Sequence, residues 1–312
     1  MEYLRFALAH RRFLGFGVTL ACFSSFGQTF FIALYGAELR AEFGLTHGGL
    51  GLIYSTATLA SGFTIIWLGR LVDSVELRRL SVLICLALAA ACLAMAAVPT
   101  AVLLYGVFFL LRLSGQGMMT HTSVTSVARH YERDRGKAVA IVSLGLPVGE
   151  AVLPLTAVAL VGVVGWRLSW VAAALLLVLV VVPLVIWLLG GEAARNRTAG
   201  ATMAAPDERT GRQWSRREVL GDKRFYLILP AVIASSYIIT GLFFHQAHLA
   251  EAKGWSLAWI ATCFVGYAAG TVVAALAAGP MVDRVGAGRL LHLYLLPLAF
   301  GLLLLVVGRQ PL

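Results

Sequence analysis

Gly69-Arg70-Leu71-Val72-Asp73 ends a long apolar segment and opens a short charged turn. The same Gly-x-x-x-Asp pattern returns at Gly279-Pro280-Met281-Val282-Asp283, where another apolar segment ends. The distance between the two copies is far longer than the unit of any solenoid. A repeat of this period predicts two similar halves, each built from several membrane-spanning helices.

The composition indicates that lipid, rather than water, surrounds most of the chain. Of its 312 residues, 60% are hydrophobic and only 13% are charged. A soluble domain needs polar side chains on its surface, whereas a helix that faces lipid needs none. Backbone groups in hydrocarbon must be hydrogen-bonded within the segment, and the apolar runs are too long for barrel strands. The sequence therefore predicts an all-α membrane protein.

Runs of about 20 apolar residues predict nine spans. Their approximate limits are 13–36, 48–68, 80–98, 101–127, 138–161, 168–189, 225–250, 257–278 and 290–307. All four cysteines lie inside these runs, at positions 22, 85, 92 and 263, without the paired spacing of a metal site. We expect them to be small core residues that form neither a disulfide nor a zinc site.

Lysine and arginine predict the orientation of the spans. With the N-terminus in the cytoplasm, the cytoplasmic segments hold 20 of the 25 basic residues and the opposite segments hold four; Arg112 alone lies inside a span. Basic residues are retained on the cytoplasmic side, so this orientation is the expected one. The formal charge of +10 then arises mainly from cytoplasmic basic residues, which face anionic lipid headgroups. No nucleic-acid partner is therefore expected.

A polar segment divides the chain. Residues 1–189 are expected to form a six-helix half, residues 190–223 a cytoplasmic linker, and residues 224–312 three helices of a second half. Near the end of the linker, Ser215 and Glu218 fit the Ser-x-x-Glu capping box, which predicts a short helix at the membrane interface.

Six spans, a basic linker, further spans and paired Gly-x-x-x-Asp turns resemble the major facilitator superfamily of secondary transporters. In that family the turn after the second span reads like Gly-x-x-x-Asp-Arg-x-Gly-Arg-Arg, and here Ser74 and Glu76 stand where Arg and Gly are usual. The resemblance implies a helical bundle of that type and a cytoplasmic gating motif. In the motif, the glycine lets two helices approach, and the aspartate faces the positive end of a helix in the other half. The matching residues are Gly69, Asp73 and Arg78 in the first copy and Gly279, Asp283 and Arg284 in the second.

Two charged residues lie well inside spans. Arg112, in Leu111-Arg112-Leu113-Ser114-Gly115-Gln116-Gly117, resembles the family's fourth-span arginine. Glu150 follows Gly145-Leu146-Pro147-Val148-Gly149, whose glycines and proline permit close packing against a neighbouring helix. The rise per residue places Arg112 and Glu150 at similar depth, so we expect them to pair and to serve the transport pathway. The alternative for Arg112 is a structural role, bonded to backbone carbonyls.

Further polar candidates lie on the spans. Gln28 and His121 occupy spans whose family counterparts line the central cavity, and helix packing is the alternative role for both. His245 lies near the end of span seven, where His248 shares its helical face and Glu251 follows. A metal or proton site is one interpretation of this group. Amphipathic residues at the membrane surface are the preferred one, so no metal site is expected.

No nucleophile elbow, phosphate loop or catalytic triad order occurs in the sequence. The chain is therefore expected to be neither an enzyme nor a protein that binds a cofactor.

The leading hypothesis is a monomeric, multi-pass transporter of the bacterial inner membrane that moves a small-molecule substrate by alternating access, with proton coupling left open. Family members normally have twelve spans, so the nine expected here predict a C-terminally incomplete chain. A single intramembrane arginine favours organic anions, and multidrug-type efflux is the rival. The alternative from another class is a truncated membrane protein that does not transport.

Overall fold

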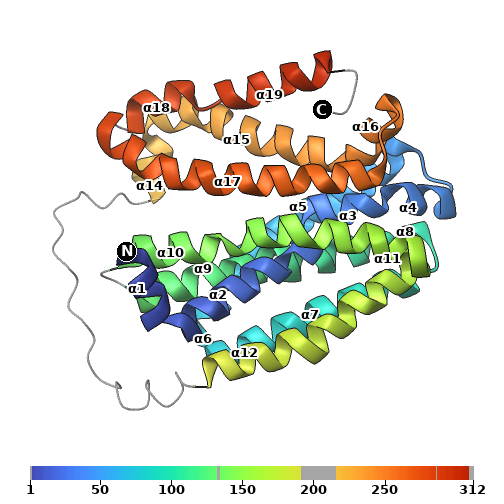
Figure 1. The fold of residues 1–312 in the computed structure, drawn as a ribbon, viewed down its shortest axis with the longest axis horizontal. Coiled ribbons are helices and arrows are strands. Elements are labelled where there is room, and N and C mark those ends of the chain that lie inside the picture. Colours follow the sequence, from blue (N-terminus) through green and yellow to red (C-terminus); the bar gives the residue numbers. More distant parts are fainter. Residues whose placement is uncertain (1, 132–133, 191–215, 286, 309–312) are drawn as a thin grey trace.

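A computed structural model describes residues 2–131, 134–190, 216–285 and 287–308, and in these ranges the chain forms helices and no strand (Figure 1). The all-α prediction is confirmed. The helices before residue 190 are α1 (Glu2–Ala9), α2 (Arg11–Phe23), η1 (Ser24–Gly27), α3 (Thr29–Ile32), η2 (Ala33–Tyr35), α4 (Gly36–Phe43), α5 (His47–Leu68), α6 (Leu71–Ser74), α7 (Leu77–Ala97), α8 (Ala101–Leu111), η3 (Arg112–Met119), α9 (Thr120–His130), α10 (Arg135–Ser143), α11 (Gly145–Leu176), η4 (Leu177–Val181) and α12 (Val182–Leu189). Those after residue 215 are α14 (Arg216–Gly221), α15 (Lys223–Phe244), α16 (Gln246–Lys253), α17 (Leu257–Val285), α18 (Ala287–Leu293) and α19 (Leu296–Val307). Ser215, expected to cap the interfacial helix, lies outside the described residues.

Within the described ranges, seven helices are long and apolar enough to cross a membrane, and one bent pair raises the number to eight. One of the seven, Arg135–Leu189, has 55 residues. A straight helix of that length would measure about 80 Å, whereas the hydrocarbon layer is about 30 Å thick. It is interrupted at Gly165, and the ribbon turns back between α10 and α12 (Figure 1). Its two arms match the spans predicted at 138–161 and 168–189; the total of nine stays a prediction.

Gly165 makes this reversal possible. Its φ of 81° and ψ of 165° are not helical, and the combination is essentially restricted to glycine because a Cβ atom would collide with the backbone. Beyond the chain neighbours and the nearby backbone of the helix, no atom lies within 4 Å of the position that a Cβ would take, so the requirement at Gly165 comes from the local backbone conformation and not from a neighbouring element.

The first predicted span, expected to be continuous over 13–36, is broken in the structure. Gln28 is extended, with φ of −84° and ψ of 153°, and the segments on either side of it, Arg11–Gly27 and Thr29–Phe43, meet at 41°. The bend removes backbone groups from the helical hydrogen-bond ladder inside a membrane span, where they need other partners. One feature of the sequence indicates this break: the small and polar residues of the run Ser24-Ser25-Phe26-Gly27-Gln28 weaken a helix.

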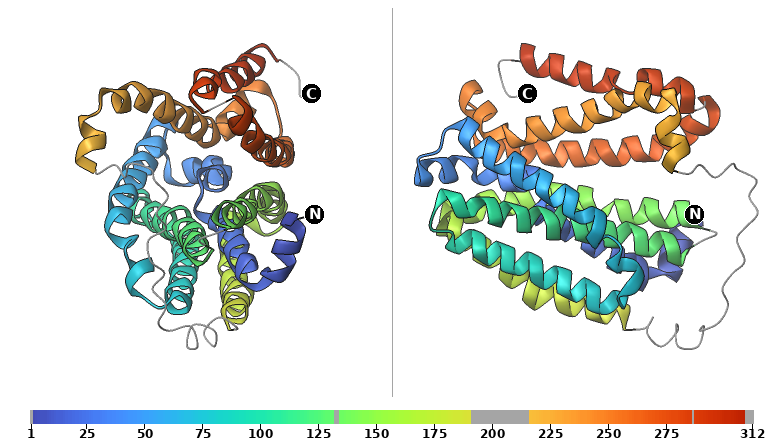
Figure 2. Two further views of the ribbon diagram at one scale, coloured as in Figure 1. Left: turned by 90° about the vertical axis from the view of Figure 1, so that its left-hand side faces the viewer. Right: turned by 180° about the vertical axis from the view of Figure 1, so that it is seen from behind.

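The helices on the two sides of residues 191–215 pack against each other. α11 lies beside α17, and two views show α14–α19 gathered on one side of the first group (Figures 1 and 2). Gln246 Nε2 on α16 donates a hydrogen bond of 2.6 Å to the carbonyl of Phe30 in the broken span. Polar contacts thus join the two groups as well as apolar ones.

The buried side chains are concentrated in the first group. Its largest fully buried members include Trp170, Tyr35, Phe16 and Phe108. In contrast, α15 and α19 contain no buried residue. The polar site described below therefore lies in the better packed part of the bundle.

Candidate functional site

Arg112 begins an eight-residue π-helical segment, η3, between α8 and α9. Widened turns of this kind inside α-helices occur frequently at functional sites. Gly115 brings the segment into contact with η1, because a methyl group at Gly115 would lie 2.6 Å from the Cα of Gly27. The glycine-rich face predicted after Arg112 therefore permits backbone-to-backbone packing against the broken first span.

The Arg112 side chain is only 5% exposed and lies against this break. Its Nη1 donates to the carbonyl of Gly27 at 3.2 Å and to Thr29 Oγ1 at 3.1 Å. Tyr54 supports the same group, since its hydroxyl donates to Thr29 Oγ1 at 2.7 Å and its ring centroid lies 5.5 Å from the guanidinium carbon. The bend at Gln28 takes the Gly27 carbonyl out of the α-helical ladder, and Arg112 supplies the missing donor.

A cavity of about 400 Å³ lies between α5, η3 and α9. Its volume falls within the range of about 300 to 1,000 Å³ that is usual for small-molecule sites. Arg112 and His121, both singled out from the sequence, line the same space. The polar residues of the lining are Thr58, Ser61, Arg112, Gln116, Thr120 and His121.

Three lining residues carry buried polar atoms that lack a hydrogen-bond partner in the described part of the chain: Thr58 Oγ1, Thr120 Oγ1 and Arg112 Nε. Buried polar groups are normally paired, so unpaired ones around one cavity mark it as a place for water or for a polar ligand. No carboxylate of the described residues lines the cavity, and Arg112 forms no ion pair with any of them. The positive charge of Arg112 therefore favours a ligand with a negative charge.

Glu150 lies elsewhere. It is 6% exposed on the part of α11 that packs beside α17, and it forms neither a hydrogen bond nor an ion pair with a described residue. The expected ion pair with Arg112 is not present among these residues, because Arg112 contacts the first span instead. The neighbouring glycines do pack closely as predicted: a methyl group at Gly145 would lie 2.8 Å from Ala21 Cβ, and Gly149 touches the backbone of Cys22.

Comparison with protein families accounts for this arrangement of apolar helices around a buried arginine. A family model described as Major Facilitator Superfamily matches residues 17–311. The chain belongs to the major facilitator superfamily. No curated protein matches it. Members of the superfamily are transporters, so the chain is a multi-pass membrane protein of a class that moves small solutes across the bilayer.

The first Gly-x-x-x-Asp turn of this major facilitator superfamily chain follows α5. Gly69 is held through its carbonyl, which lies 3.2 Å from His121 Nε2. A carbonyl oxygen can only accept, so Nε2 of His121 carries the proton and donates this bond. His121 thereby connects the cavity that it lines to the Gly-x-x-x-Asp turn.

Asp73 in the same turn forms an ion pair with Arg129 at the end of α9. The resemblance had implied a partner at a helix of the other half, whereas Arg129 belongs to the same group of helices. Both side chains are about half exposed, and exposed ion pairs contribute at most about 1 kcal/mol. Arg78, the other predicted member of this copy, is exposed.

The second copy of the motif lies at the end of α17. The side chains of Gly279, Asp283 and Arg284 lie outside the described part of the structure, so their roles in this superfamily member stay predictions.

Two further predicted residues lie away from the cavity. Gln28 sits at the break in the first span, where its side chain forms no hydrogen bond with a described residue. His245 lies between α15 and α16 and lines a small cavity of about 20 Å³ with Arg40, His47 and His248. The structure thus brings Arg112 and His121 to one cavity, whereas Gln28, Glu150 and His245 do not line it.

Sequence reasoning missed the residues that hold Arg112 in place. Thr29 follows a break in the helix that the continuous apolar pattern of residues 13–36 does not indicate. In the sequence, nothing distinguishes Tyr54 from the other aromatic residues of the apolar spans. Only the run of small and polar residues before Thr29 could have signalled an irregular backbone there.

Proposed function

We propose that this superfamily member is a secondary active transporter that moves a small organic anion by alternating access, and that the cavity beside Arg112 binds it. One observation carries the proposal: a buried arginine that has no carboxylate partner among the described residues lines a cavity of ligand size. A charged side chain at membrane depth is costly and is retained chiefly where it has a function. A guanidinium group also matches a carboxylate in geometry, because it can donate two parallel hydrogen bonds.

In this proposal Arg112 binds the anionic group, and Gln116 and the unpaired hydroxyls of Thr58 and Thr120 bind its polar substituents. His121 links occupancy of the cavity to the gating turn through Gly69. Gln28 and His245 are secondary substrate candidates. The proposed gating residues are Gly69, Asp73 and Arg78 in the first copy and Gly279, Asp283 and Arg284 in the second.

The proposed setting is the bacterial inner membrane, with the N-terminus and residues 190–223 in the cytoplasm and with a monomeric chain. The distribution of basic residues supports this orientation. Residues 1–189 and 224–312 are proposed to act as the two moving parts, with residues 190–223 as their linker.

A binding experiment tests the ligand class. The purified chain in detergent is heated with sodium benzoate, lactate or succinate, and separately with ethidium as an amphipathic cation. We expect at least one carboxylate to raise the thermal midpoint in a saturable manner, since a ligand that binds only the folded state stabilises it. Stabilisation by ethidium alone, or by none of the carboxylates, would contradict the anion proposal and, in the first case, favour drug efflux.

Glu150 is proposed to carry the coupling proton, because it is buried without a cationic partner among the described residues, and proton relays use buried carboxyl groups. In liposomes, an inward proton gradient is expected to stimulate carboxylate uptake several-fold by the unmodified chain. Glu150→Gln should lose this stimulation and retain exchange of labelled for unlabelled carboxylate. Glu76→Gln, at an exposed position, is the matched control. Full gradient stimulation in Glu150→Gln would exclude the proposed role.

A further inference from the structure

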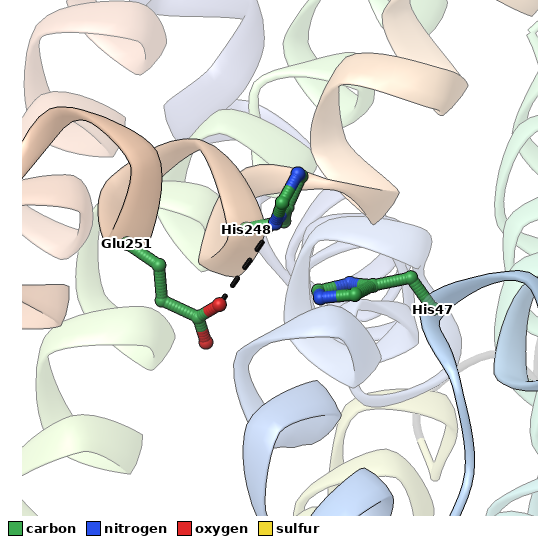
Figure 3. Close-up of side chains that lie close together, drawn as sticks. All are labelled: His47, His248 and Glu251. Atoms are coloured by element: carbon green, nitrogen blue, oxygen red, sulfur yellow. Dashed lines mark ion pairs between the residues drawn. The ribbon is translucent and has the colours of Figure 1, made fainter.

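Three potential metal ligands, His47, His248 and Glu251, lie close together near the start of α5 (Figure 3). His47 is the first residue of α5, and His248 and Glu251 lie on α16. One donor atom from each residue lies within 4.8 Å of the other two. His248 Nδ1 is 3.9 Å from Glu251 Oε2, and the two imidazole rings have centroids 4.2 Å apart. The sequence analysis had considered His248 and Glu251 but not His47.

Two imidazoles and one carboxylate form a ligand set that suits Zn²⁺ and similar divalent transition-metal ions. Tetrahedral coordination with bonds of about 2.0 to 2.1 Å places the ligand atoms about 3.3 Å from one another. The observed separations, up to 4.8 Å, are larger by an amount that small side-chain rotations can close. His248 and Glu251 are exposed and His47 is partly exposed, so an ion can reach them from water.

The backbone on both sides of the cluster is well anchored. Thr46 caps α5 by accepting a hydrogen bond of 3.0 Å from the backbone N–H of Gly49, which fixes the helix start at His47. On α16, the spacing of three places His248 and Glu251 on one face. Gln246 ties the start of α16 to Phe30. The ligands thus come from two regular elements, which position metal ligands better than mobile loops do.

Arg40 on α4 already forms hydrogen bonds with two of these three ligands. Its Nη1 lies 2.9 Å from His47 Nε2, and its Nη2 donates to Glu251 Oε1 at 3.1 Å. The guanidinium is always protonated and has no acceptor, so His47 Nε2 must accept this bond with its lone pair. The same lone pair would bind a metal ion. Arg40 and a metal ion therefore compete for His47 and for the negative charge of Glu251.

We propose that His47, His248 and Glu251 bind one divalent transition-metal ion of the Zn²⁺ type, which displaces Arg40 and leaves a fourth position for water. The ion would connect α5 of the first group of helices to α16 of the second. No residue of the proposed transport site takes part, so the metal site can be tested separately from the transport activity.

Co²⁺ binding to the purified chain tests the site, because Co²⁺ in a tetrahedral site has a characteristic visible spectrum. After treatment with a chelator, the chain is titrated with Co²⁺, which Zn²⁺ then displaces. We expect one Co²⁺ per chain. His47→Ala, His248→Ala and Glu251→Gln should each weaken binding at least tenfold, whereas His10→Ala, at a histidine before α2 that packs on Phe6 and Tyr131, should stay within twofold. His248→Gln replaces His248→Ala if the latter is not monodisperse in detergent.

Absence of a saturable Co²⁺ spectrum, or equal affinity in the unmodified chain and in His248→Ala, would overturn the proposal. Arg40→Gln tests the competition separately. Removal of the competing cation is expected to tighten Zn²⁺ binding several-fold. Weaker binding in this variant would show that Arg40 supports the site and would overturn the displacement step.

Discussion

Gly115→Ala is expected to destabilise the folded chain by about 3 kcal/mol or more, the upper end of what overpacking costs in a dense interior. A methyl group at Gly115 would lie 2.6 Å from the Cα of Gly27, 2.8 Å from its nitrogen and 3.0 Å from the carbonyl oxygen of Ser24. All three are backbone atoms, so no side-chain rotation can relieve the collision. The π-helical segment would have to move away from the break in the first span.

This separation would also withdraw Arg112 from the Gly27 carbonyl, leaving both groups without a partner at membrane depth. The measurement is the thermal midpoint of the purified variant in detergent, together with its monodisperse yield. Gly106→Ala is the matched control, since Gly106 lies on the preceding helix, α8, where a Cβ would have no atom within 4 Å beyond the chain neighbours and the nearby backbone of that helix. Alanine favours a helix over glycine, so the control should be neutral or slightly stabilising. Equal midpoints for the two variants would show that the close contact does not hold the bundle together.

Arg112→Gln is expected to weaken carboxylate binding at least tenfold. Hydrogen bonds to a charged group contribute about 1.5 to 3 kcal/mol, which corresponds to roughly a 10- to 150-fold change in affinity. Arg112→Lys keeps the charge but loses the paired donors, so its affinity should lie between those of the unmodified chain and of Arg112→Gln. Affinity is measured from the dependence of the thermal midpoint on carboxylate concentration.

Arg12→Gln is the control for the loss of one positive charge, since the Arg12 guanidinium lies over the ring of Trp187 and does not line the cavity. Its carboxylate affinity should match that of the unmodified chain. If Arg112→Gln folds and binds carboxylates as well as Arg12→Gln does, then Arg112 serves only to satisfy the backbone of the broken span.

Sequence patterns predicted correctly those features that follow from the physical properties of a single residue type. Gly145 and Gly149 were predicted to allow close packing, and both touch neighbouring elements as expected. The apolar runs likewise predicted the observed helices, including the two arms on either side of Gly165, but not the break at Gln28 in the first span. These features depend on local composition, which the sequence states directly.

The failed prediction of an Arg112–Glu150 pair has a geometric reason. The rise per residue gives the depth of each side chain, but the direction in which it leaves the helix depends on how the helices are rotated and packed. The break at Gln28 also offered Arg112 a carbonyl partner that hydropathy could not reveal. In the same way, the meeting of His47 with His248 depends on the packing of α5 beside α16, and no local pattern specifies it.

Uptake of a radiolabelled carboxylate into liposomes tests the central claim most directly, with the carboxylate that raises the thermal midpoint most as the probe. The unmodified chain, Arg112→Gln and Arg12→Gln are reconstituted at equal density. We expect saturable uptake by the unmodified chain and by Arg12→Gln, competition by unlabelled carboxylate, and uptake by Arg112→Gln reduced at least tenfold. Equal, saturable uptake by all three proteins, or no uptake above that of empty liposomes, would contradict an anion transporter whose substrate binds at Arg112.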